Sequence, residues 1–350
     1  MMALSRYLLI LVTVHSSLQM DQSLDQLIST VRALPDLNQR KIASVLGAVV
    51  ADAASVPLEW IYDEAKLVEV VGEREEVAFW PKCESPYFDL PTGSVSCYSD
   101  EMLTTLGSMA TSQQVSIDQI TRAVEETFGS PSSPYQVSLA RRGEGYPVEG
   151  PWLNGVIIQS VKNIKSGKQP SGDSKKKDQD GFFVSLPAFL STLDYGLTRN
   201  VTKIVSVNDI ALKYSRVQQS LVENFLTQRE DPIKSTLASV DDEDIASVLE
   251  MVYAGVGAGK TVNELVATFG KSCAYPGSLQ SELAVLLLTE DYQTAVRTNI
   301  MAGGDSCSRA GFIGAVLGAQ GGIDVIPREW MEKVFNVENI LEDLITVFGE

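Results

Sequence analysis

Apolar residues recur at helical spacing along most of this chain, and this periodicity constrains the fold more than any other feature. One helix face is formed by Leu24, Leu27, Ile28 and Val31. A Leu-Pro-Asp turn at 34–36 ends that segment, and a second apolar helix is expected from about residue 40 to 56. Strand-type alternation is scarce. The sequence therefore predicts an all-α protein.

Further helical segments are expected near residues 115–128, 205–228, 240–255, 260–270, 278–289, 291–301, 305–319 and 328–347. At ordinary helix lengths the whole chain would hold about eight to twelve helices. Residues 166–181 read SGKQPSGDSKKKDQDG and predict a loop whose lysine run is a solvated tip. Since no internal repeat or interdomain linker is visible, residues 20–350 are expected to form one domain.

The first nineteen residues, MMALSRYLLILVTVHSSLQ, have two interpretations. Arg6 precedes a short apolar run, which is typical of a weak secretory signal; alternatively, the segment is an upstream extension and Met20 is the effective start. The run is too short to span a membrane, which takes about 20 apolar residues. Because the signal is weak and a cysteine framework is lacking, a cytoplasmic protein that does not bind membranes is expected.

The charge balance and the scarcity of histidine exclude several classes of function. The 350 residues carry 28 Lys and Arg against 45 Asp and Glu, a net charge of −17, whereas a protein that grips a nucleic-acid duplex needs a basic face. The single histidine, His15, lies in the N-terminal stretch. If that stretch is removed or peripheral, Ser-His-Asp and Cys-His catalysis and histidine-ligated metal sites are excluded. The four cysteines include no C-x-x-C pair.

The first of three unusual segments is residues 47–60, GAVVADAASVPLEW. Small residues recur every fourth position and form a flat helix face that another helix can approach: Gly47, Ala51 and Ser55. Asp52 interrupts this apolar helix and needs a partner to offset its desolvation. Glu59, seven residues on, would point the same way if the helix continued past Pro57. The purely structural alternatives are a hydrogen-bonded core acid at Asp52 and a helix-capping or surface acid at Glu59.

The second and third segments also combine oxygen-bearing side chains with a probable helix start. Residues 98–103, YSDEML, place a hydroxyl before two carboxylates, which suits either a helix cap or a site for a hard cation. Residues 302–319, AGGDSCSRAGFIGAVLGA, place Asp305 and Ser308 at the start of a helix rich in glycine. Each helical glycine costs about 1 kcal/mol relative to alanine, so close packing is expected to offset the loss.

These three segments, in this order, resemble the ADP-ribosylglycohydrolase family, which carries G-D-x-x-G-x-x-x-E, T-D-D-T and G-G-D-x-D-T motifs. The final IPREW at 326–330 resembles the closing motif of the family. The segment GPWLNG at 150–155 and the LEW ending at 58–60 resemble the branch that contains J-type lens crystallins and selenoprotein J. The resemblance covers most of the chain after about residue 41. It implies a single orthogonally packed helical domain and, in active members, two Mg²⁺ ions at a cleft.

Carried over residue by residue, the resemblance implies a metal site formed by Glu59, Ser99, Asp100, Glu101, Asp305 and Ser308. It assigns catalytic roles to Glu59 and Asp100. Cys307 stands where the family has an aspartate, and a thiol is a poor ligand for Mg²⁺. The four carboxylates carry enough charge for two Mg²⁺ ions. A metal-free cluster in which Arg309 pairs with the carboxylates is the alternative.

The stretch that corresponds to the substrate-side loop of the family departs further. Residues 178–187 read DQDGFFVSLP and lack the glycines and the arginine of active members. The resemblance implies Mg²⁺-dependent hydrolysis of glycosidic bonds to ADP-ribose, with ADP-ribose or an ADP-ribosylated molecule as the partner. The departures predict that this activity is weak or lost. The alternative function is structural, as a soluble crystallin-like protein, for which a high negative charge is suitable.

Overall fold

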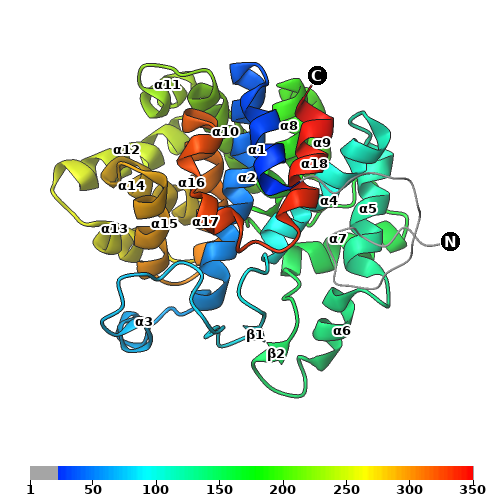
Figure 1. Ribbon diagram of the computed structural model, residues 1–350, viewed down its shortest axis with the longest axis horizontal. Coiled ribbons are helices and arrows are strands. Elements are labelled where there is room, and N and C mark those ends of the chain that lie inside the picture. Colours follow the sequence, from blue (N-terminus) through cyan, green and yellow to red (C-terminus); the bar gives the residue numbers. More distant parts are fainter. Residues whose placement is uncertain (1–22, 350) are drawn as a thin grey trace.

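The computed structural model describes residues 23–349, and its secondary structure is almost entirely helical (Figure 1). The described residues form eighteen α-helices: α1 (Leu24–Arg32), α2 (Asp36–Ser55), α3 (Glu64–Val71), α4 (Cys97–Ser112), α5 (Ile117–Gly129), α6 (Pro134–Arg141), α7 (Gly155–Lys165), α8 (Asp180–Thr192), α9 (Tyr195–Val205), α10 (Asp209–Leu226), α11 (Pro232–Ser239), α12 (Glu243–Gly257), α13 (Val262–Phe269), α14 (Gly277–Leu288), α15 (Tyr292–Met301), α16 (Ser306–Gly321), α17 (Arg328–Met331) and α18 (Val337–Phe348). The all-α prediction is confirmed. The N-terminal stretch 1–19 lies outside the described residues.

Other regular structure is minimal in this part of the chain. Two-residue strands, β1 (Phe88–Asp89) and β2 (Val148–Glu149), pair in parallel with Phe88 opposite Val148. Short 3₁₀ turns, η1 (Val56–Leu58) and η2 (Ile323–Val325), follow α2 and α16. The strands are too short to form a layer, and they tie two long connections together beside the helices.

The expected eight to twelve helices prove too few, because many helices here are short. Five of the described helices, α3, α6, α11, α13 and α17, have eight residues or fewer. The segment expected near 328–347 is two helices, because Asn336 adopts a left-handed φ of 58° between α17 and α18. The expected loop at 166–181 is confirmed up to Gln179, and α8 begins at the next residue, Asp180; Lys175 within the loop is exposed.

Helices α2 and α16 lie side by side near the middle of the molecule, and their glycines set how closely they approach (Figure 1). A Cβ atom added to Gly47 would lie 2.5 Å from the carbonyl oxygen of Gly314, which is too close for any real contact. A Cβ on Gly318 would collide in the same way with the carbonyl oxygen of Ala43. Ser44 donates a hydrogen bond across this contact to the carbonyl of Ala315, over 2.9 Å. The predicted small-residue faces therefore form the central helix contact.

Two apolar clusters flank helix α4, which carries the second motif. The larger cluster surrounds α2 and α16, and the second lies between α5, α7 and α9. Helix α4 packs against α8, α5 and α18, so its first turn is enclosed on several sides. One described helical segment, 36–58, is long and apolar enough to cross a membrane, but 94% of its apolar window is buried inside the protein. It is therefore a core helix by burial.

Candidate functional site

Glu59 is turned into the protein interior by the end of α2. The helix stops at Ser55, the 3₁₀ turn η1 follows, and Glu59 takes an extended conformation with 1% of its surface exposed. Its Oε2 accepts hydrogen bonds from the Ser306 hydroxyl (2.7 Å) and the backbone N–H of Cys307 (2.8 Å). Its Oε1 is buried and has no hydrogen-bond partner. The alternative of a surface acid is therefore wrong for Glu59, and its bond from the Cys307 N–H caps the first turn of α16 from outside that helix.

Backbone hydrogen bonds fix the Glu59 segment beside the start of α16. The N–H of Trp60 donates to the carbonyl of Gly304 over 2.8 Å, and the N–H of Gly304 donates to the carbonyl of Ile61 over 2.9 Å. Both Trp60 and Gly304 have positive φ, at 63° and 75°. A Cβ on Gly304 would collide with the backbone of Lys271, so glycine is required at this turn. The first and third motifs are therefore joined by main-chain contacts.

Asp305 begins α16 and lies against Glu59. Its Oδ1 accepts a hydrogen bond from the backbone N–H of Ser308 (3.4 Å), and the Ser308 hydroxyl donates to the carbonyl of Asp305 (3.2 Å). The Tyr98 hydroxyl donates to Asp305 Oδ2 over 3.1 Å. Burial, followed by the neighbouring charge of Asp305, raises the pKa of Glu59 well above its ordinary value. The structure thus brings Glu59 and Asp305 together, and Asp305 and Ser308 line the helix start as predicted.

The cap of α4 is Ser96, not Ser99 or Asp100 as the sequence suggested. The Ser96 hydroxyl accepts a hydrogen bond from the N–H of Tyr98 (3.2 Å) and donates to Asp52 Oδ1 (2.6 Å). The backbone N–H of Ser96 donates to Asp52 Oδ2 (2.8 Å). Ser99 is buried, and hydrogen bonding by its hydroxyl lowers the pKa of Asp52. Asp52 is therefore a hydrogen-bonded core acid, which was the structural alternative to a functional role. Burial raises its pKa to about 6, although the hydrogen bonds from Ser96 and Ser99 lower it.

Asp100 faces away from α16, toward α6. The Tyr135 hydroxyl donates to Asp100 Oδ2 over 2.6 Å, and both side chains are buried. Burial raises the pKa of Asp100 to about 7, the Tyr135 hydrogen bond opposes this rise, and the charge of Asp52 adds to it. Asp100 thus has Asp52 as its acidic neighbour, and no contact with Glu59 or Asp305 is found among the described residues.

Glu101 forms a separate acidic pair with Asp180, at the start of α8. The Asn154 amide donates to Glu101 Oε1 (3.3 Å) and to Asp180 Oδ1 (3.2 Å), which fixes the two carboxyl groups relative to each other. Glu101 Oε1 also accepts from the Cys97 thiol (3.5 Å), whereas Oε2 is buried without a partner. Burial and then the charge of Asp180 raise the pKa of Glu101. Burial and then Asp178 raise the pKa of Asp180.

The Cys307 thiol lies between the acids of the first and third motifs. It is fully buried, its sulfur contacts the carbonyl of Asp52 at 3.8 Å, and the charges of Glu59, Asp52 and Asp305 all act on it. Burial and these charges raise the pKa of the thiol well above its ordinary value. We call Asp52, Glu59 and Asp305 the acidic row; a neutral thiol therefore lies among these three acids, at the position where the resemblance places an aspartate.

The donor atoms of the predicted metal site match the chemistry of Mg²⁺, but their arrangement does not. Carboxylate and hydroxyl oxygens are the ligands that Mg²⁺ prefers, and Glu59 Oε1 and Glu101 Oε2 are buried without a hydrogen-bond donor. Within residues 23–349, however, no three His, Cys, Asp or Glu side chains lie close enough together to hold one metal ion. The predicted ligands are divided between the Glu59–Asp305 pair, the Glu101–Asp180 pair, and Asp100 with Ser99 beside Asp52.

Arg309 does not pair with this cluster. Its fully buried guanidinium donates to the side-chain oxygen of Asn299 (2.8 Å) and to the carbonyls of Lys271 (3.1 Å) and Gly303 (2.5 Å). In the described chain it forms no ion pair with a carboxylate, so the alternative of an Arg-paired cluster is wrong. Its charge reaches Asp305 and Glu59 only across a longer distance. Hydrogen bonds therefore stabilise the buried carboxyl groups of Asp52, Glu59 and Glu101, and burial raises the pKa of each.

Several residues that shape the site carry little or no functional signal in the sequence. Asp180 lies in the stretch predicted as a substrate-side loop, but the buried, mostly apolar run from Phe182 to Leu190 makes most of that stretch part of α8. Asn154 appeared only in the branch resemblance, and Tyr98 appeared in the second motif without a role. Tyr135 carries no sequence signal, since its partner Asp100 is assigned by tertiary packing alone.

Comparison with known proteins defines the class to which this helical fold and acidic site belong. The sequence model of the ADP-ribosylglycohydrolase family matches residues 33–350, and the chain belongs to that family. The chain is 27% identical to crystallin J1A of Tripedalia cystophora over 309 residues, covering 87% of this chain and 94% of the crystallin. It is 26% identical to crystallin J1B of the same organism over 312 residues, covering 87% and 95%.

A solved structure titled ADP-ribosylglycohydrolase-related protein complex shares the fold. It superposes with a TM-score of 0.62 at 16% sequence identity, covering 90% of this chain and 98% of the other. The resemblance read from the three motifs is thus confirmed at the level of family and fold.

Proposed function

We propose that this chain is an ADP-ribosylglycohydrolase-like protein whose hydrolysis of ADP-ribosyl glycosidic bonds is weak or absent. The observation that carries the proposal is the neutral, buried thiol of Cys307 in the middle of the acidic row. Thiols are poor ligands for Mg²⁺, which requires near-ideal octahedral oxygen coordination. The division of the other carboxyl groups into separate pairs supports the same conclusion.

The carboxyl groups of Glu59 and Asp100 are also poorly suited to act as general bases. Two Mg²⁺ ions, where a family member holds them, supply the charge that orients the ribose hydroxyls and polarises the attacking water. Without such charge, burial and then Asp305 raise the pKa of Glu59, which favours the protonated carboxyl, and a protonated carboxyl cannot act as a general base. Asp100 accepts a hydrogen bond from Tyr135, and the acid that acts on it is Asp52, not Glu59. We therefore assign Glu59 and Asp100 catalytic roles only in the residual reaction.

A substrate panel tests this proposal. The full chain is assayed for release of ADP-ribose from N-linked and O-linked ADP-ribosylated peptides, with and without millimolar Mg²⁺. We expect rates far below the ordinary enzyme range of about 1–10³ s⁻¹. Cys307→Asp serves as the gain-of-function variant, and Cys307→Ser controls for loss of the thiol alone. A wild-type rate inside the ordinary range would overturn the proposal.

A structural role is the second candidate, and the likeness to two crystallins over most of the chain favours it. A net charge of −17 suits a protein held at high concentration, because like-charged molecules repel one another. Static light scattering tests this role: the osmotic second virial coefficient should be strongly positive at low salt and neutral pH. It should fall as the pH approaches the isoelectric point near 4.6. Attraction between molecules at low salt and neutral pH would contradict it.

We also propose that the protein acts in the cytoplasm, on the weakness of the apolar run in residues 1–19. N-terminal sequencing of the protein from its native cells tests this. Recovery from the medium of a chain that begins between Ser16 and Asp21 would contradict it.

A further inference from the structure

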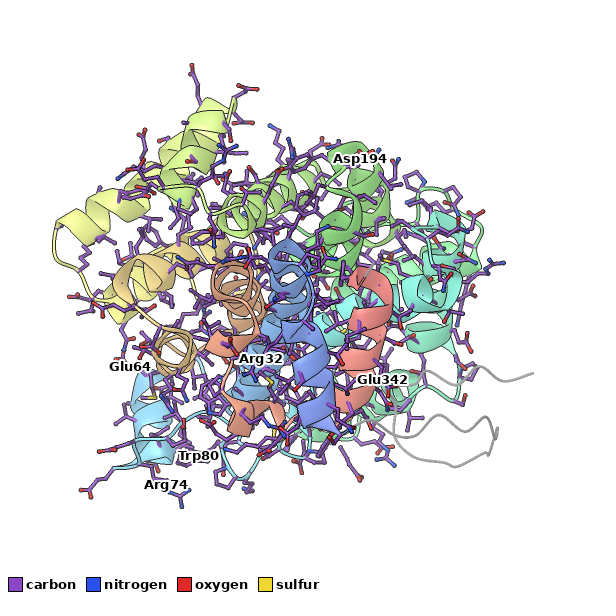
Figure 2. The ribbon with its side chains drawn as sticks, turned by 45° about the horizontal axis from the view of Figure 1, so that its top comes forward. Arg32, Glu64, Arg74, Trp80, Asp194 and Glu342 are labelled. Carbon is purple, nitrogen blue, oxygen red and sulfur yellow. The ribbon has the colours of Figure 1, made fainter. Side chains whose placement is uncertain are left out.

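A groove between α9 and α10 contains a pocket of about 250 Å³ that shares no residue with the acidic site. Its walls include Tyr195, Arg199, Thr202, Arg216 and Gln219. Thr202 and Gln219 are 2% exposed and form a polar floor, whereas both arginines are exposed to solvent. In Figure 2, Asp194, the cap of α9, lies at the periphery of the molecule, so the groove opens near the surface.

Two guanidinium groups share this pocket without a carboxylate ion-pair partner. In the part of the chain that the structure describes, neither Arg199 nor Arg216 lies within salt-bridge distance of an acidic side chain. The Arg216 guanidinium lies over the ring of Tyr195, and the Tyr195 hydroxyl donates to Glu223. Glu223 therefore acts on Arg216 only at longer range.

The helix positions next to each arginine also carry no acidic side chain. Three and four residues from Arg199 on the same helix lie Tyr195, Gly196, Thr202 and Lys203. The same positions around Arg216 are Leu212, Lys213, Gln219 and Ser220. The acids nearest the pocket are Glu223, which accepts the Tyr195 hydrogen bond, and Asp194, which caps α9, so each has a hydrogen-bond donor other than the two arginines. An anion bound in this pocket would be attracted to both guanidinium groups that line it.

We propose that this pocket binds a phosphate group, either as free phosphate or as part of a small phosphorylated molecule. Guanidinium groups donate paired N–H bonds to tetrahedral oxyanions, and two of them can hold three or four phosphate oxygens. The pocket is larger than a phosphate group alone, so a short attached group fits beside Tyr195. The site is separate from the acidic row and does not depend on its metal content.

Calorimetric titration of the full chain at constant ionic strength tests the proposal, with inorganic phosphate, glycerol 3-phosphate and acetate as probes. Arg199→Gln removes an exposed guanidinium, and Arg216→Lys keeps the charge and loses the paired geometry. Arg122→Gln, on the exposed face of α5, is the matched control for charge. Melting temperatures without phosphate establish that each variant is folded.

We expect phosphate binding that Arg199→Gln weakens at least about tenfold and Arg216→Lys weakens several-fold, while Arg122→Gln leaves it unchanged. Tighter binding of the ester identifies a phosphorylated molecule as the ligand, and equal or weaker binding of the ester identifies free phosphate. The proposal is overturned if acetate binds as tightly as phosphate, if no phosphate binding is detected, or if folded Arg199→Gln binds like the wild type.

Discussion

The carboxylate of Glu59 accepts a hydrogen bond from the backbone N–H of Cys307 over 2.8 Å, so the first-motif acid is held by the residue that departs most from the family pattern. This bond comes from the main chain and therefore survives any substitution at position 307 other than proline. The position of Glu59 is thus preserved while the chemistry beside it has changed. Substitutions at 307 should alter cation binding without displacing Glu59.

Cys307→Asp should lower stability without Mg²⁺ and increase the response to it. A fourth acid beside Glu59, Asp52 and Asp305 would be buried without a partner, at a cost of about 2 kcal/mol or more. Mg²⁺ would remove that cost by coordinating the new carboxylate. Melting curves and calorimetry at several Mg²⁺ concentrations measure both effects, with Cys307→Ser as the uncharged control. Unchanged Mg²⁺ affinity would show that position 307 does not correspond to the second aspartate of the family motif.

Mg²⁺ at millimolar concentration should raise the melting temperature of the wild type by less than that of Cys307→Asp, since a ligand that binds the folded state stabilises it by mass action and the Glu59–Asp305 pair lacks a third carboxylate ligand. Asp305→Asn should abolish this shift and keep the fold, because an asparagine oxygen can still accept the capping bond from Ser308. Asp291→Asn at the cap of α15 is the matched control, since that aspartate also accepts a bond from the third residue of its helix. A shift that persists in Asp305→Asn would place the cation elsewhere.

Glu282→Gln should stabilise the protein increasingly as the pH rises. Burial raises the pKa of Glu282 to about 8 from an unfolded value of 4.5, so folding favours the protonated carboxyl. Its stabilising contribution is complete below about pH 4.5 and is lost as the pH rises toward 8. Glutamine mimics the neutral form and can still accept the bond from Gln218. The variant should match the wild type at about pH 5 and exceed it by a few kcal/mol at about pH 8.

Urea denaturation across this pH range measures the difference. Glu290→Gln, at an exposed position, controls for the change in net charge. A difference between Glu282→Gln and the wild type that is constant with pH would mean that Glu282 has the same protonation state in the folded and unfolded chains.

Gly318→Ala should destabilise the central contact between α2 and α16. The added Cβ would overlap the carbonyl of Ala43, and the two helices would have to separate at a cost of about 1–3 kcal/mol or more. Gly257→Ala, at the end of α12, is the matched control, because its Cβ would meet nothing within 4 Å. The control should be neutral or stabilising by up to about 1 kcal/mol. Equal stabilities of the two variants in urea denaturation would mean that the contact relaxes freely.

Local patterns account for what was predicted correctly. The spacing of Leu24, Leu27, Ile28 and Val31 defines a buried helix face whatever lies opposite it, and all four are buried in α1. The glycines of α16 predicted close helix packing, because a missing Cβ has the same effect in any environment. An average helix length predicted too few helices. Short helices such as α13 are stable because they pack against the core and because Thr261 forms a capping box at the start of α13.

The sequence by itself determined that the chain is helical, which small residues meet, and which acids lie at helix starts, because these depend on neighbours within a turn or two. Only the tertiary structure decided which acids face one another. Glu101 meets Asp180 through Asn154, and Asp100 meets Tyr135, because the rotation of α4 and the packing of α6, α7 and α8 direct those side chains. Side-chain direction between distant elements depends on the packing of the whole core, and no spacing within a motif contains that information.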